Sequence, residues 1–474
     1  MGNTPLAWAA MNGHSEVVKL LLERDDIDPN KTNGFGETPL MLAAWNGHSE
    51  VVKLLLGRDD IDPNKPDEEG QAPLMLAAWN GHEGVVKILL GRDDIDPNLP
   101  DDGGLTSLFL AACNGREEVV KILLSRDDIE PDKPNSDGQT PLFGATCNGH
   151  EGVMKMLLGQ DNINPDESDG NGRTPLYFAA RYGHEGAVEM LLKRDDVDPN
   201  TVDGHGQTPL YCAARNGYER VVEILLRQDD VVPNTPDDDG RTPLYFAAEN
   251  GHEGVVEMLL AQDDIDPDIP DNYGKTPLYC AASNGNELVV EMLLGRDDID
   301  PNAPNDDGET PLHCATRYGH DGVVNMLLAQ DDIDPDKPDK FGQSPLFCAA
   351  GYGNEGVVNM LLGRNDVDPN KPDHKGQTPL LLAAGYGYEE LVKMLLERGD
   401  INPDISDMDG ETPLYRAALH EYEGVVRILL RWDEFNPDNP NTCRQTALSL
   451  AIRNENTHVV ALLQPPRAAT HSQY

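Results

Sequence analysis

The sequence predicts an all-α protein, a solenoid of helix-turn-helix-loop repeats joined by β-turn or hairpin-like connectors. The first observation is a strict period of 34 residues, since the proline of T-P-L lies at Pro5 and Pro39, recurs in A-P-L at Pro73 and keeps that spacing, with Ser107 and Ala447 on the same grid. The second is that each period contains a run of small residues and a run of paired apolar residues at helical spacing. The third is a segment with two prolines that separates one period from the next. Such a repeat buries its apolar face by stacking on its neighbours.

The period divides residues 1–463 into fourteen repeats, and we expect residues 464–474 to form a disordered tail. The last repeat carries Arg444, Ala447 and Glu455 where others have Gly, Pro and Gly, which is typical of a capping repeat. The first repeat lacks its turn loop and has helices like internal ones, so we expect an uncapped apolar face there. The hypotheses are that the chain is the later part of a longer protein, that its start is mis-assigned, or that a partner covers this end.

The first helix of each repeat is expected to begin at the proline of T-P-L. Threonine is a favoured N-cap residue, and proline fits the first helical position because its missing N–H would have no partner there. Small residues, mostly Ala-Ala, follow, and a glycine ends the helix. The second helix, with the pattern H-x-x-V-V-x-x-L-L, has one apolar face to bury.

Histidine opens the second helix in half of the repeats, which raises the question of a metal-binding array. Neighbouring copies are a whole repeat apart, and Arg116, Tyr218, Asn286, Asn354 and Tyr388 take the same position elsewhere. A metal site needs several ligands around one point. We therefore predict a structural role for His14, His48, His82, His150, His184, His252 and His320.

The segment R-D-D-I-D-P-N, which occurs four times unchanged, is either a calcium loop or a connector. Asp60, Asp62 and Asn64 reproduce the start of an EF-hand loop, but Lys65 stands where the turn needs glycine and Gln71 where a bidentate glutamate is needed. We interpret it as a connector, in which aspartates adopt left-handed conformations at the helix exit and bond to nearby amides. A further hypothesis is that the stacked acidic connectors bind Ca²⁺ or Mg²⁺ weakly, which would relieve their self-repulsion.

Charge and cysteine content narrow the partners and the compartment. With 37 Lys and Arg against 84 Asp and Glu, the net charge of −47 disfavours nucleic acids and anionic membranes, and basic proteins are the expected partners. The amino terminus lacks the pattern of a secretory signal or of a membrane span. The seven cysteines are mostly one or more repeats apart, too far to form disulfides, which favours a reducing, intracellular compartment, either cytoplasm or nucleus.

No catalytic or cofactor-binding motif occurs in the sequence. It has no nucleophile elbow, phosphate-binding glycine loop, HExxH or CxxC pair. A catalytic set also needs dissimilar residues around one point, which a near-identical repeat does not naturally provide. We therefore expect no enzymatic activity, no cofactor and no dedicated metal site.

The pattern D-x-x-G-x-T-P-L-x-x-A-A-x-x-G-H-x-x-V-V-x-x-L-L resembles the ankyrin repeat over practically the whole chain. The repeat is one residue longer than the family's usual length of about 33. The residue after T-P-L, usually histidine in the family, is here mostly Tyr, Phe or Met, with His313 the one match, so we expect aromatic packing in place of the family's Thr–His hydrogen bonds. The D-D-I/V-D-P-N variant resembles the long ankyrin arrays of filamentous fungi, which often follow a nucleotide-binding signalling domain.

The resemblance implies that partners bind in a concave groove lined by the two residues between A-A and the glycine. These positions vary between repeats and hold Trp, Tyr and Arg, which dominate interface energies. We predict two patches, a tryptophan pair towards one end and a tyrosine run towards the other. The predicted partner-binding residues are Trp45, Trp79, Arg181, Tyr182, Arg215, Glu249, Arg317, Tyr318, Tyr352 and Tyr386. The alternative is that these rings pack on the adjacent repeat and bind nothing specific.

We therefore expect a non-catalytic protein–protein interaction scaffold that binds partners, basic ones in particular, through this groove. One alternative is the C-terminal ligand-sensing or regulatory part of a larger signalling protein with an upstream effector domain. Another is an elastic or buffering array that responds to divalent cations. The sequence indicates neither the oligomeric state nor the identity of the partner.

Overall fold

Paired helices form the regular secondary structure of the described chain. The computed structural model describes residues 2–432 and 436–464, and these residues contain 28 helices and no strand. The fold class predicted from the sequence, an all-α solenoid of tandem helix pairs, is therefore confirmed. The predicted disordered tail lies outside the described residues, apart from Gln464.

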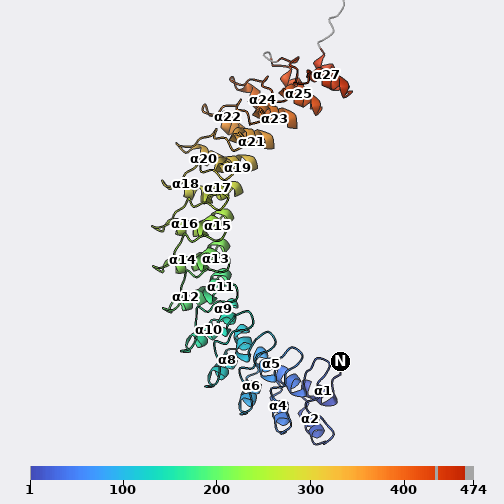
Figure 1. Ribbon diagram of the computed structural model, residues 1–474, viewed down its shortest axis with the longest axis vertical. Helices are drawn as coiled ribbons and strands as arrows, with labels where there is room; N and C mark the ends of the chain where they lie inside the picture. Colours follow the sequence, from blue (N-terminus) through green and yellow to red (C-terminus); the bar gives the residue numbers. More distant parts are fainter. Residues whose placement is uncertain (1, 433–435, 465–474) are drawn as a thin grey trace, which may run out of the picture. The chain divides into compact units, whose positions relative to one another are not determined.

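The chain divides into two compact units, Met1–Asp238 (unit 1) and Asp239–Tyr474 (unit 2), and within each unit the helix pairs follow one another in chain order (Figure 1). The helices of unit 1 are α1 (Pro5–Met11), α2 (Ser15–Leu22), α3 (Pro39–Trp45), α4 (Ser49–Leu56), α5 (Pro73–Asn80), α6 (Glu83–Leu90), α7 (Ser107–Cys113), α8 (Glu117–Leu124), α9 (Pro141–Cys147), α10 (Glu151–Leu158), α11 (Pro175–Tyr182), α12 (Glu185–Leu191), α13 (Pro209–Asn216) and α14 (Glu219–Leu226).

The helices of unit 2 repeat the same alternation of a first helix that begins at T-P-L and a second helix that carries the paired apolar residues. They are α15 (Pro243–Asn250), α16 (Glu253–Leu260), α17 (Pro277–Asn284), α18 (Glu287–Leu294), α19 (Pro311–Tyr318), α20 (Asp321–Leu328), α21 (Pro345–Tyr352), α22 (Glu355–Leu362), α23 (Pro379–Tyr386), α24 (Glu389–Glu397), α25 (Pro413–Leu419), α26 (Glu423–Leu429), α27 (Ala447–Arg453) and α28 (Thr457–Leu463).

The first helices begin as predicted. In α3 the Thr38 hydroxyl oxygen accepts a hydrogen bond from the backbone N–H of Met41 at 3.2 Å, and Pro39 takes the first helical position. The first helix of a pair packs against the first helix of the next pair, as α3 does against α5, and the second helices do the same, as α4 does against α6. Ala43, Ala44 and their counterparts are buried in this contact, so the small residues let the helices approach closely.

The arginine of the connector caps the second helix of the preceding repeat. Arg58 donates through Nε and Nη2 to both carboxylate oxygens of Asp60, at 2.8 and 2.7 Å, and through Nη1 to the carbonyl oxygen of Leu22 at the end of α2, at 2.8 Å. A helix end leaves such carbonyls without an intrahelical partner. The same three contacts recur at Arg92, Arg126, Arg194, Arg296 and Arg364.

An asparagine links each of several connectors to the next. Asn64 Nδ2 donates to the carbonyl oxygen of Asp94 at 2.5 Å, and its Oδ1 accepts from the backbone N–H of Asp96 at 3.2 Å. We call the residues that make both bonds the rung asparagines. They are Asn30, Asn64, Asn98, Asn200, Asn302 and Asn370.

The expectation of left-handed aspartates in the connectors was wrong. In the described part of the chain, the non-glycine residues with positive φ are Glu421, Arg444 and Glu455. The expected bonds to nearby amides are confirmed, as the backbone N–H of Asn30 donates to Asp28 Oδ1 at 2.9 Å, and other connector aspartates accept from arginines, as Asp60 does from Arg58. Left-handed turns belong mainly to glycines such as Gly47, with φ of 75°, where an added Cβ would lie 2.6 Å from the ring of His82. The glycine is therefore required both by its backbone conformation and by the close approach of the next repeat.

Candidate protein-binding groove

A hollow with a volume of about 960 Å³ lies over the first helices of three successive pairs in unit 1. We call it the tryptophan groove because Trp8, Trp45 and Trp79 line it, together with Phe35 and Leu42. The three tryptophans are 54%, 44% and 40% exposed. About half of each residue's surface therefore stays open to a partner.

The next repeat holds the helix end that carries each predicted tryptophan. Trp45 is the last residue of α3, and its carbonyl oxygen lies 2.9 Å from Nε2 of His82. Trp79 lies in the last turn of α5, and its carbonyl oxygen accepts from Nε of Arg116 at 3.0 Å. Both tryptophans are therefore carried by backbone that is fixed on two sides, which favours preorganised binding.

These contacts also show what the histidines of the second helices do. The imidazole Nε2 contacts a carbonyl oxygen at the end of the first helix of the preceding repeat. Asn286 and Asn354 make the same contact through their side-chain amide nitrogens. The structural role predicted for the histidines is thus seen at His48, His82, His150, His184 and His320, at 2.9 to 3.2 Å.

Two aromatic residues of the groove were not predicted. Trp8 lies one helical turn before the variable positions. The next two repeats carry Leu42 and Leu76 at the position of Trp8, so the sequence pattern indicates a core position there. Phe35, 61% exposed, lies in the turn of a connector rather than on a helix. Helical spacing could have indicated Trp8, because residues three apart share a helix face and Trp8 therefore lies beside Met11, which occupies a variable position.

Carboxylates form the polar rim of the groove. Glu37, Asp67, Glu68 and Glu69 line it, and the described lining residues include no Lys or Arg. The amide nitrogen of Asn33 donates to Glu37 Oε2 at 2.6 Å and so orients that carboxylate. The groove therefore combines apolar aromatic rings with four carboxylates, and no cationic side chain is among its described lining residues.

The other predicted residues of unit 1 lie outside the groove lining. Arg181 and Tyr182 end α11, and both side chains are exposed. Arg181 Nη1 donates to the Tyr177 hydroxyl at 3.1 Å, and the Tyr182 ring lies 5.8 Å from that of Phe178. Arg215 is exposed on α13.

In unit 2 the predicted residues lie on four first helices, and Arg317 and Tyr318 share α19. Tyr318, Tyr352 and Tyr386 are the last residues of α19, α21 and α23, and each is more than half exposed. Arg317 lies 5.9 Å from the centre of the Tyr352 ring, a cation–π distance. Glu249 is half-buried on α15.

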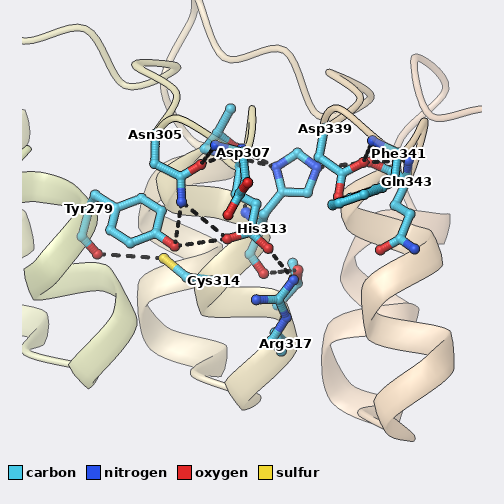
Figure 2. A network of polar contacts seen from close by, with 12 residues as sticks. Tyr279, Asn305, Asp307, His313, Cys314, Arg317, Asp339, Phe341 and Gln343 are labelled. Atoms are coloured by element: carbon cyan, nitrogen blue, oxygen red, sulfur yellow. Dashed lines mark hydrogen bonds and ion pairs between the residues drawn. The ribbon is translucent and has the colours of Figure 1, made fainter. Parts of the chain in front are cut away.

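Arg317 is part of a network between neighbouring repeats (Figure 2). It donates to Glu309, whose other carboxylate oxygen accepts from the Tyr279 hydroxyl at 3.1 Å and from Asn305 at 3.2 Å. Burial alone would raise the pKa of Glu309, but the hydrogen bond and charge of Arg317 outweigh it and hold the pKa below its ordinary value. Much of the Arg317 side chain is therefore engaged within the fold.

His313 makes the threonine–histidine contact that the resemblance implies. Its Nδ1 accepts from the backbone N–H of Thr310 at 3.0 Å, and Nε2 lies 3.0 Å from the carbonyl oxygen of Gln343 in the next repeat (Figure 2). Burial lowers the pKa of His313, which favours the neutral ring that this pair of contacts requires.

Aromatic packing is only part of what replaces this histidine elsewhere. Tyr245 packs edge-on against Phe246 with ring centres 5.5 Å apart, as expected, but its hydroxyl also donates to Asp271 Oδ2 of the next repeat at 3.0 Å. The tyrosines therefore keep a hydrogen bond between repeats. Tyr177, Tyr211, Tyr279 and Tyr415 do the same with Gln207, Asp237, Glu309 and Gln445.

Within residues 2–432 and 436–464, no helix is long and apolar enough to cross a membrane. No group of three or more His, Cys, Asp or Glu side chains there is placed to hold a metal ion. All seven cysteines are free, and four of them are buried in the first helices.

A family model described as ankyrin repeats (three copies) matches overlapping segments that together extend over nearly the whole chain. The chain therefore belongs to the ankyrin repeat family, whose members generally serve as protein–protein interaction modules and are typically not catalytic. A search of curated proteins found no match. The matched segments are 6–101, 74–169, 108–203, 161–237, 230–305, 298–373 and 346–441.

Proposed function

We propose that this protein is a non-catalytic scaffold and that its tryptophan groove binds a basic segment of a partner protein. The observation that supports this most is the coincidence of three half-exposed tryptophans with four carboxylates in one hollow. The aromatic rings offer contact area to a partner, and the carboxylates favour a partner segment that carries positive charge.

The chemistry of the groove favours lysine or arginine next to an apolar residue. A cation over the face of a tryptophan gains about 0.5–1 kcal/mol at an exposed site and about 2 kcal/mol when it is desolvated. The aliphatic part of a lysine or arginine side chain also packs well on an indole ring. Phosphate-bearing partners are disfavoured, because the rim carboxylates and the net charge of −47 repel them.

The predicted residues of unit 1 outside the groove belong to this proposal as secondary contacts. Arg181, Tyr182 and Arg215 lie on helices α11 and α13, and a long partner segment would meet them after leaving the groove. In unit 2, Glu249, Arg317 and the exposed tyrosines Tyr318, Tyr352 and Tyr386 belong to a separate surface, which a peptide bound in the groove does not need.

The experiment is a selection of peptides on the purified full chain, followed by calorimetry with one selected peptide. We expect selected sequences to be enriched in Lys or Arg beside an apolar residue. Since buried tryptophan anchors are worth about 2 kcal/mol or more, Trp45→Ala/Trp79→Ala should weaken binding at least about 30-fold.

The matched control is Tyr318→Ala/Tyr352→Ala, which removes two aromatic rings from residues of unit 2 that are 59% and 60% exposed. This variant should bind the selected peptide within about threefold of the wild type. Acidic or neutral peptides in the selection, or equal losses in the two double variants, would contradict the proposed groove. Circular dichroism of both variants would establish that helix content is unchanged.

A further inference from the structure

Six repeats carry an aspartate where others carry a rung asparagine. At Asp404 both carboxylate oxygens lie 3.2 Å from the backbone nitrogen of Asn436, and Asp438 is exposed. We call the other four the rung aspartates, and they are Asp132, Asp166, Asp268 and Asp336. In each, Oδ2 accepts from the backbone N–H of the residue 32 positions later, at 2.8 to 3.3 Å. The other carboxylate oxygen, Oδ1, is buried and has no hydrogen-bond partner.

The rung asparagines show what is missing at this oxygen. Asn302 Oδ1 accepts from the backbone N–H of Asp334 at 2.8 Å, and its amide nitrogen donates to the carbonyl oxygen of Asp332 at 2.9 Å. By the same register, Oδ1 of a rung aspartate takes the place of that donating nitrogen. An ionised carboxylate and a carbonyl are both acceptors, so no hydrogen bond forms between them without a proton.

A proton on the carboxyl group would restore the missing donor, because a protonated aspartic acid donates one hydrogen bond. Burial raises the pKa of all four rung aspartates, and the hydrogen bond from the backbone N–H only partly opposes this effect. The charged groups that face them are Glu167 for Asp132, Asp196 and Asp198 for Asp166, Asp266, Asp298 and Asp300 for Asp268, and Asp334, Asp368 and the cationic Lys371 for Asp336.

We propose that the rung aspartates are proton-binding joints between neighbouring connectors. As the pH falls, each takes up a proton, donates a hydrogen bond to the carbonyl oxygen of the next connector, and completes the rung that asparagine completes at every pH. Each unit contains two such joints, Asp132 and Asp166 in unit 1 and Asp268 and Asp336 in unit 2.

The sign of the effect follows from the raised pKa values. A carboxyl group with a higher pKa in the folded chain than in the unfolded chain stabilises the fold fully below the unfolded value. This contribution is lost as the pH rises through the folded value. The joints are therefore tighter in mild acid and looser at neutral pH.

The test compares the melting temperature of three full-length chains at about pH 7 and at about pH 4, which is near the ordinary pKa of an aspartate side chain. The first is the wild type, and the second carries Asp132→Asn, Asp166→Asn, Asp268→Asn and Asp336→Asn. The third is a matched control with Asp127→Asn, Asp161→Asn, Asp263→Asn and Asp331→Asn, which removes the same charge from exposed aspartates of the same four connectors.

At about pH 7 the rung variant should melt above both other chains, and this gap should close in mild acid as the wild type gains protons. Equal behaviour of the rung variant and the control would mean that only net charge matters, and would overturn the proposal. Millimolar Ca²⁺ at fixed ionic strength and neutral pH could also raise the melting temperature of the wild type but not that of the rung variant. That result would mean that the rung aspartates bind a cation rather than a proton, and it would overturn the proposal as well.

The reverse substitution keeps the test decisive if the fourfold variant folds poorly. Asn64→Asp/Asn302→Asp creates two new rung aspartates, one in each unit. This variant should melt below the wild type at neutral pH and recover in mild acid. A deficit that is the same at both pH values would show that the new carboxyl groups do not gain a proton in the rung, which would contradict the proposal.

Discussion

Replacing Tyr245 by phenylalanine removes one hydroxyl group from a buried contact between neighbouring repeats. The hydroxyl donates to Asp271 Oδ2 at 3.0 Å, and the two residues are 4% and 7% exposed. The backbone N–H groups of Tyr273 and Lys275 both donate to the other oxygen, Oδ1, at 2.9 and 2.8 Å. Because a buried hydrogen bond to a charged group contributes about 1.5–3 kcal/mol, we expect a loss of that size in local stability.

Hydrogen–deuterium exchange of the amides around residues 271–280 measures this loss, since a repeat array can open locally. The expected loss corresponds to exchange that is about 10- to 150-fold faster. The control is Tyr273→Phe, in the same connector but 63% exposed, for which exchange should change by less than about threefold. Equal exchange in the two variants would refute the idea that the tyrosine hydroxyls couple neighbouring repeats.

Three further predictions concern the backbone, an ion pair and the thiols. Glu421→Gly should stabilise the chain by about 1 kcal/mol in denaturant unfolding, because Glu421 has a φ of 64° that glycine adopts without strain; a destabilised variant would contradict this. Burial would raise the pKa of Asp169, but two hydrogen bonds from the Arg173 side chain outweigh burial and lower this pKa. The pair therefore stabilises the fold at pH values above the pKa of the carboxyl group in the unfolded chain. This stabilisation is lost as the pH falls through the pKa of the folded chain. Arg173→Leu should therefore lower the melting temperature at neutral pH but not in strong acid, and a pH-independent difference would count against the ion pair. A thiol reagent should modify the exposed Cys443 first, because burial raises the pKa of Cys212 to about 12 and restricts access; rapid labelling of Cys212 in the native chain, followed by mass spectrometry, would contradict this.

The sequence predicts the fold because the features that determine it are local and repeated. The proline of T-P-L and the threonine before it are enough to place the start of a first helix, as at Thr38 and Pro39. The paired valines and leucines then leave one arrangement that buries them. The error on left-handed aspartates has a physical cause, since Arg58 satisfies the carbonyl at the helix end and Asp60 is needed to hold that arginine.

The groove was only partly predictable, because it depends on side chains from different positions of successive repeats. Trp45 and Trp79 occupy a variable position and were predicted, whereas Trp8 occupies a position that is core in the next repeat. Phe35 enters from a connector, and no helical pattern points to it. The unpartnered oxygens of the rung aspartates depend on contacts about one repeat away in the chain, which no local motif encodes.

Tryptophan fluorescence tests the proposed groove most directly. The chain has four tryptophans, so Trp432→Phe leaves Trp8, Trp45 and Trp79 in the groove as the reporters. Titration with a peptide selected for Lys or Arg should give a saturable change in emission, and the same peptide with Glu at those positions should give none. Binding of the basic peptide in calorimetry without any change in emission would place its site elsewhere and contradict the account.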